Sequence, residues 1–135
     1  MDVILCATGN GAQSRTVQST AVETALQRQA RLVFVHVVDL QQLGELDESL
    51  VPAARAELAW LGEAILRLAQ DRARRQGVQT TSAILYGDVR EALEGYMRAH
   101  PVTLLMMGAA TSEEITGFAR HVQDELGVAV EFVAA

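Results

Sequence analysis

A glycine that follows a strand-like run marks the residues best suited to bind a small molecule. Residues 104–107 (Leu-Leu-Met-Met) form an unbroken apolar run, which is typical of a short strand covered on both faces of a parallel sheet. Gly108 and two alanines come next, and Ser112 is then in position to cap a helix. Ligands of open α/β sheets bind at the carboxyl ends of the strands. We therefore expect Gly108 to lie beside any small-molecule site.

A second glycine-containing segment, residues 9–14 (Gly-Asn-Gly-Ala-Gln-Ser), follows another apolar run. One interpretation is a strand-to-helix turn in which Ser14 caps the helix. The other is weak anion binding, because the free N–H groups at a helix start attract negative charge. The residue types leave both interpretations open.

The titratable side chains form no recognisable catalytic or metal-binding pattern in the sequence. The three histidines, His36, His100 and His121, include no pair at four-residue spacing, so they give no metal signature. We expect His36, which lies in a strand-like run, to be packed in the core. All eleven basic residues are arginine, which excludes a lysine nucleophile, a Schiff base and a Walker-type phosphate lysine. Cys6 lies inside an apolar run and is expected to be a buried small hydrophobic residue.

Two aspartates fall where predicted strands turn into the next element. Asp88 follows a glycine and precedes a helical segment, which predicts a helix N-cap. Asp39 follows the apolar run 31–38, so it is a candidate for contact with a ribose at the strand ends.

The elements that position these residues alternate along the chain. Apolar and β-branched runs predict five strands, at residues 2–8, 31–38, 78–85, 102–107 and 128–133. Helical spacing predicts four helices between them, at residues 15–29, 52–76, 89–99 and 112–126. In the second helix, the residues predicted to face the core are Leu58, Leu61, Ile65 and Leu68. This order predicts one α/β domain, over residues 1–135, with a doubly wound parallel sheet and helices on both faces.

Composition limits the partners and the location of the protein. The chain has 135 residues, enough for one domain with a core, and half of them are apolar. A net charge of −6 argues against nucleic acid or an anionic membrane as partner. No apolar run approaches the roughly 18–20 residues of a membrane span, and the N-terminus lacks a signal-peptide pattern. With only one cysteine, these features predict a cytoplasmic protein.

Four segments, in order and across nearly the whole chain, resemble the universal stress protein family. Residues 3–8 and the loop that leads to Ser14 are similar to its first strand and Thr-Asp-Gly-Ser loop. Residues 35–39 are similar to its second strand, which ends in Val-Asp. Residues 86–93 are similar to its Gly-Asp turn and the following helix, and residues 104–108 to its strand that ends in Met-Gly.

The resemblance implies an architecture, an assembly and a ligand. The architecture is a Rossmann-like open parallel five-stranded sheet in the order 3-2-1-4-5. The assembly is a homodimer formed through the last strand, Val128 to Val133. In one branch of the family, ATP or AMP lies over the strand ends. The residues that such a ligand would contact here are Ala7, Thr8, Gly9, Val37, Val38, Asp39, Gly87, Met107, Gly108, Thr111 and Gly117.

The chain departs from the motif of the nucleotide-binding branch, which is Gly-x-x-Gly, nine residues, then Gly-Ser or Gly-Thr. Gly108 matches the first glycine, but Thr111 stands where the second is expected. The next glycine, Gly117, comes only nine positions after Gly108 and is followed by Phe118 in place of a hydroxyl residue. Gly9 replaces the acidic residue of the first loop. The phosphate-binding loop is therefore several residues short.

Two carboxylates make triphosphate binding at this loop still less favourable. Glu113 and Glu114 fall in the first turn of the predicted fourth helix. They interact favourably with the positive end of the helix dipole themselves and would repel a phosphate group. We therefore expect the nucleotide site to be lost or heavily altered.

The expected function is that of a homodimeric regulatory or interaction protein without catalysis and without a cofactor, acting on an unknown protein partner. The first alternative is a sensor that binds ATP, AMP or a cyclic nucleotide through an altered loop. The second is an enzyme of the adenine-nucleotide hydrolase-like superfamily, because residues 9–14 have some similarity to the phosphate loop of ATP pyrophosphatases.

Overall fold

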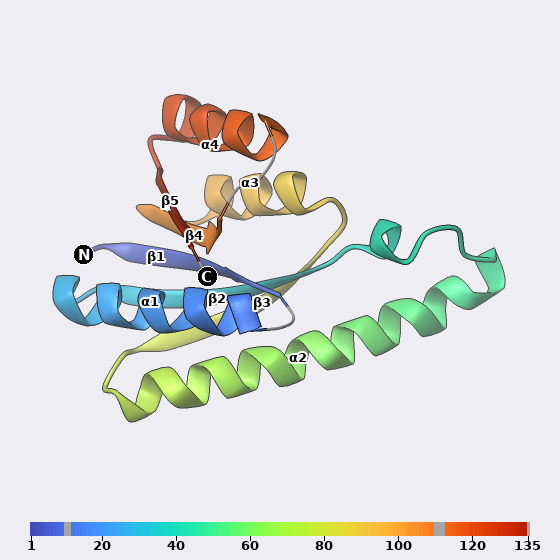
Figure 1. Ribbon diagram of the computed structural model, residues 1–135, viewed down its shortest axis with the longest axis horizontal. Coiled ribbons are helices and arrows are strands. Elements are labelled where there is room, and N and C mark those ends of the chain that lie inside the picture. Colours follow the sequence, from blue (N-terminus) through green and yellow to red (C-terminus); the bar gives the residue numbers. More distant parts are fainter. Residues whose placement is uncertain (10–11, 110–112, 135) are drawn as a thin grey trace.

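The computed structural model describes residues 1–9, 12–109 and 113–134. Figure 1 shows strands and helices alternating along the chain. The strands are β1 (Val3–Thr8), β2 (Arg31–Val38), β3 (Thr80–Tyr86), β4 (Leu104–Gly108) and β5 (Ala129–Val133). The helices are α1 (Ala12–Arg28), α2 (Val51–Arg75), α3 (Val89–Ala99) and α4 (Glu113–Leu126), with two short 3-10 helices, η1 (Leu40–Leu43) and η2 (Glu48–Leu50), before α2. Among the described residues, no helix has both the length and the apolar character needed to cross a membrane.

The five strands form one parallel sheet in the order β3-β2-β1-β4-β5. This arrangement confirms the doubly wound α/β fold and the strand order predicted above. β1 lies at the centre, where Leu5 is opposite Val33 of β2 and Leu105 of β4. Because all strands point the same way, their carboxyl ends lie along one edge of the sheet.

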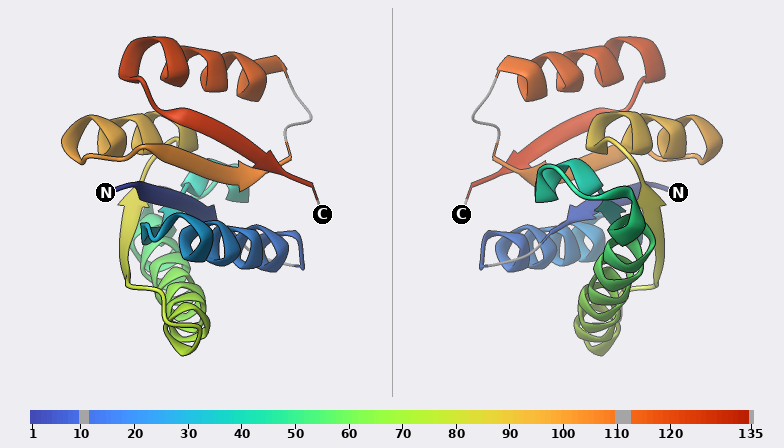
Figure 2. Two further views of the ribbon diagram at one scale, coloured as in Figure 1. Left: turned by 90° about the vertical axis from the view of Figure 1, so that its left-hand side faces the viewer. Right: turned by 90° about the vertical axis from the view of Figure 1, so that its right-hand side faces the viewer.

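Helices cover both faces of the sheet, as Figures 1 and 2 show, with α1 and α2 on one face and α3 and α4 on the other. Successive strand residues alternate between the two faces. Ile4 and Cys6 of β1 pack toward α1 and α2, whereas Leu5 packs toward α3 and α4. Cys6 is fully buried, and this burial raises the pKa of its thiol to about 12. It is the inert core residue that the sequence predicts.

The face of α2 that packs on the sheet differs from the predicted one. The buried residues of this helix are Gly62, Leu66, Ala69 and Ala73. Of the residues predicted to face the core, Leu58 and Ile65 are half-buried, but Leu61 and Leu68 have exposed fractions of 39% and 56%. The prediction was wrong for Leu61 and Leu68 because it counted only large side chains. Glycine and alanine on the inner face let the helix lie close to the sheet, and this turns the leucines outward.

Several boundaries of helices and strands also differ from the predicted ones. α1 begins at Ala12, so Ser14 lies inside the helix and is not its N-cap. β3 begins at Thr80, two residues after the predicted start. Asp88 is the N-cap of α3, as predicted, because its carboxylate accepts a hydrogen bond from the Glu91 N–H at 3.1 Å. Ser112, the predicted cap of the fourth helix, lies outside the described residues.

Candidate functional site

The carboxyl edge of the sheet brings together most of the residues implied by the family resemblance. Those on the described strand ends and the loops after them are Ala7, Thr8, Gly9, Val37, Val38, Asp39, Gly87, Met107 and Gly108. Gly117 is not at this edge, because it lies within α4, beside a depression shared with α3. Thr111 falls outside the described residues. The edge therefore gathers the predicted site without its last glycine.

A cavity of about 330 Å³ opens at this edge, where β2 and β3 end. Its walls include the predicted residues Val38, Asp39 and Gly87, with Arg55 of α2 and Tyr86 of β3 facing them. The Arg55 guanidinium lies 4.2 Å from the centre of the Tyr86 ring, a cation–π contact. Sequence reasoning missed Arg55 and Tyr86, because their approach depends on how α2 crosses the sheet.

Asp39 has a structural role in the wall of this cavity. Its carboxylate accepts a hydrogen bond from the Gln41 N–H at 3.0 Å and caps η1. Aspartate after a strand favours this turn, because its side chain can accept a hydrogen bond from the backbone N–H two residues on. A ribose bound in this cavity would have to share the Asp39 carboxylate with the Gln41 N–H.

The other end of the edge, where β1 and β4 finish, is occupied by side chains of α1. The Ser14 hydroxyl accepts a hydrogen bond from the Gly9 N–H at 2.9 Å, so this backbone donor is already used. The Gln13 side chain packs directly against Gly108, since a Cβ at position 108 would lie 3.0 Å from its amide nitrogen. The Gly9 N–H is thus used within the chain, and the exposed Gln13 side chain lies over Gly108 and would have to move aside for a phosphate.

Charge at the start of α4 matches the expectation from the sequence. Glu113 and Glu114 are exposed in the first turn of this helix. The Arg90 guanidinium lies 3.7 Å from Glu114 and 3.8 Å from Asp88, and so neutralises part of the negative charge. The arrangement supplies a carboxylate-rich helix start where a phosphate-binding loop requires unoccupied N–H groups.

His36 links the sheet edge to α2. Its Nδ1–H donates to the Thr8 carbonyl at 3.2 Å, and its ring packs against Gly62, where a Cβ would lie 2.4 Å from the ring carbon Cδ2. The Thr8 hydroxyl donates in turn to the Val35 carbonyl at 3.0 Å. Burial lowers the pKa of His36 below its usual value of 6.5, although the hydrogen bond to Thr8 opposes this effect. His36 is packed against α2, but it is only half-buried and lies toward the sheet edge, not in the core as the sequence predicts.

The protein is expected to become less stable as the pH decreases, because of His36. A lowered folded-state pKa means that the unfolded chain binds the proton first, so the free energy of unfolding should decrease as pH falls below about 6.5. Denaturant titrations of the wild type and of His36→Gln, from pH 7.5 to pH 5, measure this. Glutamine keeps a donor for Thr8 but does not titrate. If the difference in stability between the two proteins stays constant with pH, His36 is not the source.

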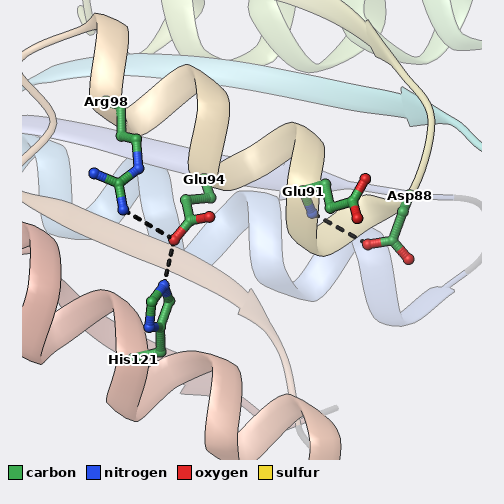
Figure 3. Close-up of polar contacts among 5 residues, drawn as sticks. All are labelled: Asp88, Glu91, Glu94, Arg98 and His121. Carbon is green, nitrogen blue, oxygen red and sulfur yellow. Dashed lines mark hydrogen bonds and ion pairs between the residues drawn. The ribbon is translucent and has the colours of Figure 1, made fainter.

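His121, on the opposite side of the sheet, has a different environment from that of His36. Figure 3 shows His121 of α4 and Arg98 pointing at the same oxygen of Glu94, which links α3 and α4. The hydrogen bond from His121 lowers the pKa of the Glu94 carboxyl. No group of histidine, cysteine or acidic side chains in the described residues could hold a metal ion. These residues tie two helices together at the surface.

A family model described as "Universal stress protein family" matches residues 1–122. The chain belongs to the universal stress protein family. No curated protein sequence matches it. A solved universal stress protein from Burkholderia pseudomallei is 28% identical, with a TM-score of 0.76, and the match covers 99% of this chain and 96% of that one.

Two further universal stress proteins of known structure share the fold. UspA from Lactobacillus plantarum is 21% identical, with a TM-score of 0.77 and coverage of 98% of this chain and 97% of that chain. A family protein from Arabidopsis thaliana, solved with AMP bound, is 12% identical, with a TM-score of 0.69 and coverage of 99% and 92%. The family fold therefore includes at least one nucleotide-bound example.

Proposed function

We propose that this universal stress protein is a cytoplasmic regulatory or interaction protein that acts as a homodimer, without catalysis and without the usual ATP site. The observation that carries the proposal is the occupied end of the sheet edge. Ser14 uses the Gly9 N–H, and Gln13 packs against Gly108. A triphosphate would have to displace both side chains and lie near Glu113 and Glu114. The function then rests on protein surfaces, with a protein partner whose identity is open.

A second candidate function is binding of a ligand with fewer phosphates, such as AMP. The cavity lined by Val38, Asp39 and Gly87 favours it, because this cavity lies away from Gln13 and Ser14 at the β2 and β3 ends. The AMP bound to the Arabidopsis relative shows that the fold accommodates such a ligand in that protein. Binding of AMP but not of Mg·ATP is the result that this candidate predicts.

The proposed homodimer uses β5, which among the described residues pairs only with β4 and therefore ends the sheet. The Ala129 N–H donates to the Thr103 carbonyl at 3.2 Å, on the β4 side. Because backbone donors alternate along a strand, the Val130 N–H points to the open edge. An apolar edge strand with free donors invites pairing with another chain. The same strand of a second copy, antiparallel about a two-fold axis, satisfies both edges.

Val130→Pro is expected to convert a micromolar dimer into a monomer. Proline removes the outward donor, and its loss costs no hydrogen bond to β4. Sedimentation equilibrium at about 5 μM compares the wild type, Val130→Pro and the control Val130→Ala, which keeps the N–H and should stay dimeric. A monomeric wild type would remove β5 from the interface. So would a folded proline variant that dimerises as tightly as the wild type.

A further inference from the structure

Three arginines line a groove of about 240 Å³ between α1 and α2. They are Arg15 of α1 and Arg72 and Arg75 of α2. Figure 1 shows the two helices on the same side of the sheet, and a hydrogen bond from Arg72 to Gln18 joins them at the groove. The groove shares no lining residue with the cavity at the carboxyl edge. It therefore gathers positive charge, in a chain of net charge −6, away from the candidate site.

Two of the three arginines have no carboxylate partner. Arg75 forms an ion pair with Asp71 at 2.9 Å. Arg15 and Arg72 form no ion pair with any of the described residues. Arg72 is half-buried, and its one described hydrogen bond goes from Nη1 to the neutral side chain of Gln18 at 3.5 Å. Because a guanidinium has five N–H donors, most of those on Arg72 stay available to a ligand.

A buried polar side chain holds Arg72 at the wall of the groove. Gln18 has an exposed fraction of only 6%. Its amide Nε2–H donates to the Ser14 hydroxyl at 3.4 Å, and its Oε1 accepts the hydrogen bond from Arg72. This support restricts the arginine side chain before any ligand arrives. Binding then loses less side-chain freedom than it would at a mobile surface arginine.

The helix dipole of α1 adds to the positive charge at the groove. Arg15 is the fourth residue of α1, and the first turn of this helix contains no acidic residue. The positive end of a helix dipole repels a cation, so an anion beside Arg15 would interact favourably with both. Val22 and Ala69, which are buried and apolar, also line the groove. Such surroundings strengthen the attraction between opposite charges.

The C-terminal end of α2 makes the opposing contribution, because the dipole of this helix is negative there. Its last carbonyls are capped within the chain. The Ala73 carbonyl accepts a hydrogen bond from the Gln76 N–H at 3.0 Å. The Arg74 carbonyl accepts one from the Gly77 N–H, also at 3.0 Å. With these carbonyls capped and Asp71 paired, the two arginines without a carboxylate partner determine the charge of the groove.

We propose that the groove between α1 and α2 binds a phosphate group, held by the guanidinium groups of Arg15 and Arg72. The planar guanidinium donates parallel hydrogen bonds to two oxygens of a phosphate. A doubly charged phosphate balances both arginines, whereas one carboxylate balances only one. The groove is smaller than the roughly 300–1,000 Å³ of sites for drug-sized ligands. It suits a free phosphate ion or the phosphate of a small ester.

A ¹H–¹⁵N NMR titration with sodium phosphate, at constant ionic strength and pH 7, tests the proposal. The Gln18 side-chain amide and the backbone signals of Arg15 and Arg72 should shift together, with half-saturation at about 10 mM. The signal of Arg67, which is exposed on α2 outside the groove, should not move. At this affinity, a phosphate compound at 1 mM fills only about a tenth of the groove.

A parallel titration with glycerol 3-phosphate distinguishes the two sources of the phosphate group. Shifts of the same signals with both compounds support a site for the phosphate group of organic molecules as well as for the free ion. Shifts with inorganic phosphate alone support a site for the free ion. If neither compound moves the Gln18 amide up to about 100 mM, the proposal is wrong.

Arg72→Met and Arg15→Met remove one guanidinium each and keep an apolar stem. Either change should weaken phosphate binding at least about tenfold, because a charge-assisted pair of hydrogen bonds is lost. The matched control is Arg67→Met, which should bind phosphate as the wild type does. Circular dichroism checks that each variant is folded, and the exposed position of Arg15 makes its variant the safer of the two. Equal phosphate affinity in Arg15→Met and Arg67→Met would overturn the proposal.

Discussion

Leu105→Ala is expected to lower the free energy of unfolding by about 2–5 kcal/mol. Leu105 is completely buried in β4, opposite Leu5 of β1 and Val130 of β5. It packs in the core under α3 and α4, so truncation leaves a cavity between three strands and two helices. Denaturant titration of both proteins gives the difference directly.

Leu68→Ala is the matched control for this core substitution. The side chain of Leu68 is 56% exposed on α2, and the same chemical change there should cost less than about 1 kcal/mol. A cost below about 0.5 kcal/mol for Leu105→Ala would place β4 at the periphery and contradict the sheet order.

Gly62→Ala is expected to destabilise the protein although it adds alanine to the middle of a helix. Helix propensity alone favours the change by about 1 kcal/mol. The new Cβ would lie 2.4 Å from Cδ2 of His36, whose ring is held by Thr8, and such overpacking costs about 1–3 kcal/mol. The expected net result is a loss of stability, measured by thermal or denaturant unfolding.

Gly95→Ala in α3 provides the opposite outcome for the same substitution. Among the described residues, a Cβ built at position 95 meets no atom within 4 Å apart from its chain neighbours and the backbone of its own helix, so helix propensity should dominate and raise stability by about 0.5–1 kcal/mol. If Gly62→Ala stabilised the protein as much as Gly95→Ala, the close packing of His36 on α2 would be wrong.

The sequence predicts the strands and helices well because their signals are local and agree with one another, whereas the strand order followed from the family resemblance. The apolar run 104–107 and the cap at Asp88 each fix an element without reference to distant residues. The face of α2 could not be predicted in this way. Gly62 lies against His36, which is 26 positions earlier in the chain, and only a small residue fits there. The spacing of hydrophobic residues contains no information about such a contact.

The candidate site likewise combines residues that the sequence predicts with contacts that it does not predict. Residues at strand ends, such as Gly9 and Gly108, follow from where the strands stop. The contacts that occupy them follow from the position of α1, whose first turn brings Gln13 to Gly108 and Ser14 to Gly9. Arg55 enters the cavity from α2 for a comparable reason. Such tertiary approaches leave no pattern in the sequence.

The melting temperature with and without millimolar Mg·ATP tests the central claim most directly, with AMP at the same concentration in parallel. A site saturated at 100 times its dissociation constant would add about 2.7 kcal/mol of stability, or roughly 10 °C for a chain of this size. We predict a shift of less than about 1 °C with Mg·ATP, because Gln13 and Ser14 occupy the phosphate end of the edge. A shift of several degrees with Mg·ATP, or ATP that co-purifies with the protein, would contradict the account.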